Sequence, residues 1–108
     1  MLMIVTVFRS RLKPGVREEY VALAKRMKEI VVAMPGYISD KDFVAEDGER
    51  VTVIEFESEE TLRAWRCHPE HVAAQNKARE AYFSSYRIQV CERLREAAFA
   101  AADQAADA

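Results

Sequence analysis

The chain has few cysteines, no long apolar run and little net charge, and each of these absences excludes a class of protein. Its two cysteines, Cys67 and Cys91, are too few for a disulfide framework and show neither a redox nor a zinc spacing. No stretch is long enough to span a membrane, and the opening MLMIVTVF is too short for the apolar core of a signal peptide. We therefore expect a cytoplasmic protein without a membrane partner and without a metal site.

The charged residues are nearly balanced in number. The 108 residues include 16 basic and 18 acidic side chains, well mixed along the chain, for a formal net charge of −2. Such a mixture does not resemble a surface that binds nucleic acid, so no nucleic-acid partner is expected. A chain of this length that is 50% hydrophobic has the composition of a single globular domain with one core.

The first third of the chain predicts a strand followed by an amphipathic helix. Residues 2–12 are rich in β-branched and apolar side chains, which lie on both faces of the expected strand. Pro14 and Gly15 end this strand. Apolar residues then recur at the alternating steps of a helical stripe, namely Val16, Tyr20, Leu23, Met27, Ile30 and Met34. A second proline–glycine pair ends the helix.

Three more strands are expected. Residues 37–45 and 50–57 predict a hairpin, because the intervening Asp-Gly pair favours the positive φ angles of a tight turn. Residues 86–92 predict the last strand. The Ala-rich tail, residues 93–108, is compatible with a helix, although a helix with so little to bury is marginal alone.

The stretch before the last strand predicts two helices that meet at a corner. Ser58 can cap the first helix, residues 59–67, whose acidic start suits the positive end of the helix dipole. Pro69 is well placed to begin the second helix, residues 69–83, because its missing N–H costs nothing there. His68, at the corner, is expected to cap that second helix.

The resulting order, β-α-β-β-α-β, predicts a ferredoxin-like α+β fold over residues 1–92, with an antiparallel sheet and its helices on one face. Helices on one face cannot cover the apolar residues on the other. We therefore expect a homodimer, in which a second copy of the sheet buries that face.

One helical face in this fold is unexpectedly polar. In the second helix of the corner, the residues expected to face the protein are His71, Gln75, Ala78, Arg79 and Tyr82, opposite the solvent-facing Glu70, Ala73, Lys77 and Glu80. Buried polar groups need partners, so this face suggests a cavity that holds a ligand or water. The alternative is that these side chains bond to the sheet or to a second subunit.

Several segments resemble the antibiotic biosynthesis monooxygenase (ABM) superfamily of dimeric α+β barrels. They are PGY at the second strand, the hairpin EDGERVTVIEFES, and Trp65 followed by HPEH and by AYFSSYRIQV. The resemblance implies this fold and a homodimer. It also implies one of several activities, since such domains include cofactor-free oxygenases of phenolic and quinol-like substrates, haem-degrading enzymes and isomerases.

Four positions separate these activities. The haem-degrading members have an Asn and a haem-ligating His where this chain has Phe8 and Gln75, so the axial ligand is missing and no cofactor is expected. The cofactor-free polyketide oxygenases resemble the chain at Trp65. They have an Asn and a Tyr where this chain has Thr61 and His71, which are also polar.

The resemblance implies a monooxygenase that uses molecular oxygen and a small aromatic, phenolic or quinol-like substrate. His71 suits a general base because imidazole titrates near neutral pH, and Arg79 suits stabilisation of an anion. The substrate-binding residues would be Trp65, Gln75, Tyr82, Phe8 and Thr61, with the aromatic ones as walls. The alternative is a non-catalytic, small-molecule-binding or stress-associated dimer, in which Trp65 is core and His71 is structural.

Overall fold

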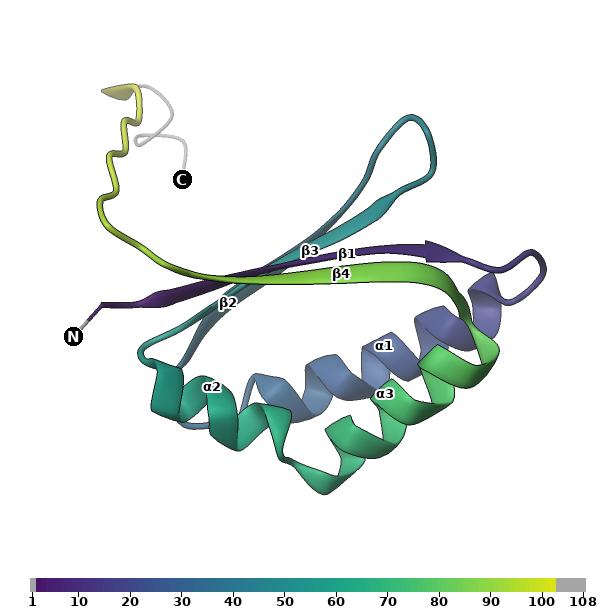
Figure 1. Cartoon of the computed structure of the whole chain (residues 1–108). Helices are drawn as coiled ribbons and strands as arrows, with labels where there is room; N and C mark the ends of the chain where they lie inside the picture. The colour runs from purple at the N-terminus through teal and green to yellow at the C-terminus, as the bar shows by residue number, and fades with distance from the viewer. Residues whose placement is uncertain (1, 103–108) are drawn as a thin grey trace.

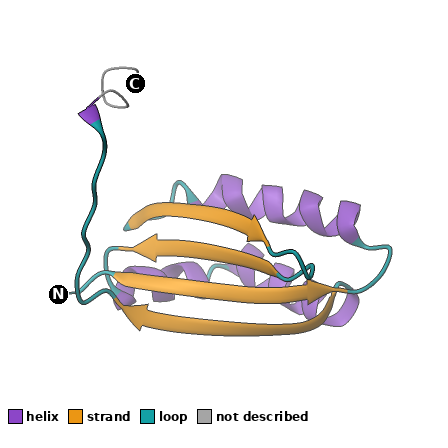
Figure 2. Ribbon diagram, turned by 90° about the horizontal axis from the view of Figure 1, so that it is seen from above, coloured by secondary structure: helices purple, strands orange, loops and turns teal. Residues whose placement is uncertain are grey.

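The computed structural model describes residues 2–102, which form a four-stranded sheet with helices on one face (Figures 1 and 2). The elements are β1 Ile4–Leu12, α1 Arg17–Val31, β2 Tyr37–Val44, β3 Arg50–Phe56, α2 Glu59–Arg66, α3 Pro69–Ala81 and β4 Phe83–Glu92. The strand order is β2-β3-β1-β4, and every neighbouring pair is antiparallel. This arrangement confirms the predicted ferredoxin-like α+β fold.

The last strand begins earlier than the sequence suggests. β4 starts at Phe83 instead of residue 86, and α3 ends at Ala81 instead of residue 83. The reason is a contact with the end of β1, because the N–H of Lys13 donates to the carbonyl oxygen of Tyr82 over 2.8 Å. Phe83 then pairs directly with Leu12, so the ladder begins as soon as the helix stops.

α1 also ends before the last residue of its apolar stripe. Its regular hydrogen bonds stop at Val31, after which Ala33 and Met34 each bond to the carbonyl three residues back, over 3.1 and 3.0 Å. Such tightened turns are common where an α-helix ends. Gly36 follows with a φ of +81°, which turns the chain into β2.

The corner between α2 and α3 forms as predicted. Ser58 and Thr61 make a capping box, in which each side chain accepts a hydrogen bond from the backbone N–H of the other. At the start of α3, His68 Nδ1 accepts the backbone N–H of Glu70 over 3.1 Å, and Pro69 occupies the first helical position. Local capping therefore sets where α3 begins.

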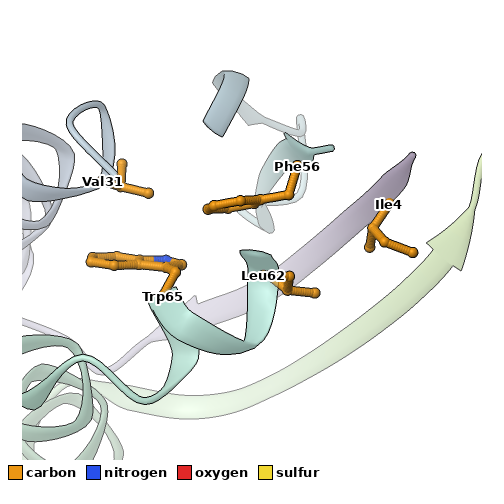
Figure 3. Packing of buried hydrophobic residues seen from close by; sticks show 5 residues of the cluster. All are labelled: Ile4, Val31, Phe56, Leu62 and Trp65. Carbon is orange, nitrogen blue, oxygen red and sulfur yellow. The ribbon is translucent and has the colours of Figure 1, made fainter. Parts of the chain in front are cut away.

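A cluster of buried apolar residues lies at one end of the layer between sheet and helices. It consists of Ile4, Val31, Phe56, Leu62 and Trp65, contributed by β1, α1, β3 and α2 (Figure 3). In the strand register, Ile4 is opposite Phe56, and six residues further along β1, Ser10 is opposite Arg50. The core therefore occupies the Ile4 end of the sheet.

The two faces of the sheet have different neighbours. Side chains alternate along a strand, so Thr6 and Phe8 share the helix-facing side with Ile4, while Val5 and Val7 lie on the other side. Val51 and Val53 of β3 pair with residues on this outer side. All three helices lie on the opposite face (Figure 1).

Beyond β4, residues 93–101 have no regular secondary structure and extend away from the sheet (Figure 1). The helix that the Ala-rich composition suggested is therefore absent there, because exposed side chains such as Leu94 and Phe99 find nothing to pack against. The rest of that prediction, from residue 103, lies outside the described residues. None of the helices in residues 2–102 combines the length and apolar character needed to cross a bilayer.

Gly36 offers a test of the α1–β2 turn. A Cβ at this position would lie 2.4 Å from Cβ of Thr61, whereas one at Gly15, with a similar φ of +80°, would meet nothing within 4 Å. We expect Gly15→Ala to cost about 1 kcal/mol from its backbone conformation alone, and Gly36→Ala to cost roughly 1–3 kcal/mol more from overpacking. Urea unfolding measures both, and equal losses of stability would contradict this account.

Candidate functional site

A cavity of about 900 Å³ lies between the helix-facing side of the sheet and the helices. Its apolar walls come from all four strands and all three helices, and include Phe8, Leu23, Met27, Ile54, Trp65, Phe83, Ile88 and Val90. Cavities of this size hold small-molecule ligands in other proteins. The core at the Ile4 end closes only part of the layer, so the remainder is available to a ligand.

His71 and Trp65 form a stacked pair at this cavity. Their ring centroids are 4.2 Å apart and their planes differ by 27°. Both residues line the cavity, and Trp65 is also part of the core. Since Trp65 sits on α2 and His71 in the first turn of α3, the corner at Pro69 brings the two rings together.

The surroundings of His71 favour its neutral form. Burial of the half-buried ring lowers the pKa of His71 from its usual value of 6.5, and the nearby His68 acts in the same direction. The backbone carbonyl groups of Arg66 and Trp65 act in the opposite direction. Its Nδ1 atom is buried and makes no hydrogen bond within residues 2–102. At neutral pH this imidazole is therefore able to accept a proton.

Arg79 lies at the other end of the cavity from the Trp65–His71 pair. It is eight residues after His71 on α3, a rise of roughly 12 Å. Its Nε donates to the hydroxyl oxygen of Tyr86 over 3.2 Å, and Tyr86 pairs with Ser10 of β1. Arg79 is exposed but lines the cavity. Its guanidinium is therefore held at the Ser10 end of the sheet.

An aromatic wall is assembled from β1 and β4, and Phe8 is the one predicted wall residue in it. Phe8 makes edge-to-face contacts with Phe83 and Tyr86, at centroid distances of 5.5 and 5.8 Å. Gln75 lines the cavity from α3. The structure thus brings Phe8, Trp65, His71, Gln75 and Arg79 to one cavity.

Two of the predicted site residues are not among those that line the cavity. The hydroxyl of Thr61 accepts a hydrogen bond from the backbone N–H of Ser58 and donates one to the carbonyl oxygen of Ser58. Tyr82, only 7% exposed, is the C-cap of α3 and packs edge-to-face against Tyr20. Neither role was visible from the helical spacing, because both depend on where each helix begins or ends.

Other residues that line the cavity were not predicted from the sequence. Thr6 is 8% exposed, and its buried hydroxyl has no hydrogen-bond partner within residues 2–102. Strand alternation places Thr6 on the same face as Phe8, so its position at the cavity could have been predicted from the sequence. The carboxylate of Asp40 accepts from Lys28 and from the hydroxyl of Tyr37, and Asp42 accepts from Thr52 over 2.6 Å. The Lys28–Asp40 and Thr52–Asp42 pairs join separate elements, so no local sequence pattern predicts them.

α3 also contributes two buried alanines, Ala74 and Ala78, between the polar residues of its inner face. Their small side chains leave space beneath the helix.

Residues 2–102 contain no group of three or more His, Cys, Asp or Glu side chains arranged to hold a metal ion.

Comparison with known proteins identifies close relatives in sequence and fold. The family model described as antibiotic biosynthesis monooxygenase matches residues 3–77. The uncharacterized protein YqjZ of Bacillus subtilis is 31% identical over 80 residues, which cover 74% of this chain and 70% of YqjZ.

Solved structures share the fold at lower identity. A Mycobacterium tuberculosis protein superposes with a TM-score of 0.80 at 23% identity, covering 89% of this chain and 99% of that one. SnoaB, a cofactor-independent oxygenase from Streptomyces nogalater, gives a TM-score of 0.75 at 14% identity, covering 90% and 97% of the two chains. At these identities the likeness concerns the fold alone.

The burial of His71 predicts how stability depends on pH. Because its pKa is lowered in the folded protein, the unfolded chain takes up this proton first, so folding loses stability as pH falls below about 6.5. We expect the free energy of unfolding of the wild type to drop more between pH 7.5 and pH 5 than that of His71→Gln. Urea unfolding at both pH values measures this difference, and parallel losses in the two proteins would refute it.

Proposed function

Because the chain belongs to the antibiotic biosynthesis monooxygenase family, we propose that it is a cofactor-independent monooxygenase of small aromatic substrates with a phenolic or quinol-like group. The observation that carries the proposal is the neutral His71 stacked on Trp65 at a cavity large enough for fused rings. The same fold supports a cofactor-independent oxygenase in SnoaB, which adds an analogy.

The first step is removal of a proton from the substrate. The imidazole of His71 accepts this proton, because burial of the ring lowers its pKa and favours the neutral form. Trp65 fixes the plane of the imidazole and, with Phe8, excludes water from the substrate rings.

The second step is reaction of the resulting anion with oxygen. An anthrone illustrates how the atoms and electrons balance. Its enolate carbon forms a bond to O₂, and the imidazolium returns its proton to the resulting peroxide. Loss of the remaining C–H proton and cleavage of the O–O bond then give a carbonyl and water. One CH₂ group and one O₂ thus become one C=O group and one H₂O, without an external reductant.

Arg79 and Gln75 have supporting roles in this proposal. Arg79 lies eight residues after His71 on α3, so we place its positive charge on the far side of the delocalised rings, where it stabilises the anion. Gln75, one turn after His71, orients the substrate or a water molecule.

We also propose that the protein works as a homodimer through the outer face of the sheet. Val5, Val7, Val51 and Val53 lie on this face, away from all three helices. Burying them against a second copy would stabilise the pair by about 25 cal/mol for each Å² of apolar surface. The exposed, unpaired thiols of Cys67 and Cys91 suit a reducing cytoplasm.

A second candidate function is a non-catalytic binding protein of the same dimeric form. The observation that favours it is the hydrogen bond from Arg79 to Tyr86. This bond uses one N–H group of the guanidinium that was predicted to stabilise the anion. Such a protein would bind the same ligands without consuming oxygen.

The role of His71 is tested by oxygen uptake with 1,8-dihydroxyanthrone. We expect His71→Gln to lower kcat by roughly 10²- to 10⁴-fold, because it removes the general base. The matched control is His68→Asn, which replaces the other histidine and keeps a side chain able to cap α3. Equal turnover by the wild type and His71→Gln would exclude His71 as the base.

The outer face is tested by sedimentation equilibrium at micromolar concentration. Val7→Glu places a charge on the central strand of the proposed interface, and we expect it to convert the dimer to a monomer. Ala73→Glu, on the exposed face of α3, is the control and should remain dimeric. A wild type that sediments as a monomer would rule out the dimer.

A further inference from the structure

The cavity has a charge opposite to that of the whole protein. The chain carries a formal net charge of −2. The cavity is nevertheless lined by six basic residues, Lys25, Lys28, Lys41, Arg50, Arg66 and Arg79, and by two acidic ones, Asp40 and Asp42. Six positive and two negative charges leave an excess of four positive charges around the site. An anionic ligand gains from such a field, whereas a neutral one does not.

The two acids are already engaged with neighbouring groups. Asp40 forms an ion pair with Lys28, and Asp42 accepts the hydroxyl of Thr52. Glu49, next to Arg50 in sequence, forms a two-point ion pair with Arg9. Within residues 2–102, Arg50 and Arg79 make no ion pair with a carboxylate. Their charges are therefore available to a ligand.

The strand register places these two arginines at the same end of the cavity. Ser10 of β1 is opposite Arg50 on one side and opposite Tyr86 on the other. Tyr86 accepts the hydrogen bond from Arg79, so both guanidinium groups flank the Ser10 end of β1. The Trp65–His71 pair is associated with the Ile4 end.

The half-buried Arg50 is positioned by its surroundings. Its guanidinium carbon lies 5.5 Å from the centroid of the Tyr20 ring, which also lines the cavity. The Tyr20 ring in turn packs edge-to-face against Phe83, at a centroid distance of 5.3 Å. A guanidinium stacked in this way keeps its N–H groups free to bind a carboxylate through two hydrogen bonds.

We propose that the substrate is an elongated aromatic acid, whose carboxylate is bound by Arg50 and Arg79 while its oxidisable ring lies against Trp65 and His71. That the ring is oxidised depends on the function proposed above, whereas the recognition of the carboxylate does not. The carboxylate binds at the Ser10 end of the cavity and sets the direction in which the flat molecule enters.

The test compares two ligands that oxygen does not consume. They are 1,8-dihydroxyanthraquinone-3-carboxylate and its neutral 3-hydroxymethyl analogue, which differ in charge but little in shape. Trp65 is the only tryptophan of the chain and lines the cavity, so quenching of its fluorescence reports binding. We expect the carboxylate to bind at least 10-fold more tightly at low ionic strength, and the preference to shrink at 0.5 M salt.

Variants test whether Arg50 and Arg79 cause the preference for the carboxylate. Arg50→Gln should remove most of the preference for the carboxylate, and leave the affinity for the hydroxymethyl analogue within about 2-fold. Arg63→Gln, an exposed arginine on α2 that does not line the cavity, is the matched control and should retain the preference. Arg79→Gln should reduce the preference as well.

The outcomes separate this inference from the proposed activity. Equal affinities of the wild type for the two ligands would overturn it, as would a preference that survives in both Arg50→Gln and Arg79→Gln. An Arg50-dependent preference without oxygen uptake for 1,8-dihydroxyanthrone or its 3-carboxylate would support carboxylate recognition and reject the monooxygenase.

Discussion

The packing of Trp65 against Val31, Phe56 and Leu62 is the contact on which the rest of this structure depends. It joins α1, β3 and α2 at the Ile4 end of the sheet (Figure 3). Because this cluster lies at the Ile4 end, the remainder of the layer between helices and sheet is left as a cavity. The same ring supports His71, so the fold and the candidate site share one side chain.

The cavity combines an uncharged base with a cationic rim, and the two features have different physical origins. Burial against Trp65 keeps His71 neutral, which a base requires. Arg50 and Arg79 supply positive charge from the Ser10 end of the cavity, where the strand register and the hydrogen bond to Tyr86 place them. An aromatic substrate with an acidic end would use both environments, since its rings need desolvation and its carboxylate needs a counter-ion.

The order of the elements and the corner at Pro69 could be predicted from sequence, because turns, caps and apolar periodicity act over a few residues. The same reasoning identified His71, Gln75 and Arg79 as one inward face, and the structure places all three at the cavity. It failed for the start of β4, where a hydrogen bond from Lys13 overrides the helical pattern of residues 69–83. For residues 93–101, a composition compatible with a helix does not produce one without a surface to bury.

By itself, the sequence determined the strand and helix order, the breaks between them and the polar side of α3, since each follows from the backbone preferences of neighbouring residues. Only the tertiary structure decided that Arg79 bonds to Tyr86, that Asp40 pairs with Lys28 and that Arg50 shares an end of the cavity with Arg79. The reason is strand register and helix docking. They bring together residues distant in the chain, and no local pattern encodes which of them will meet.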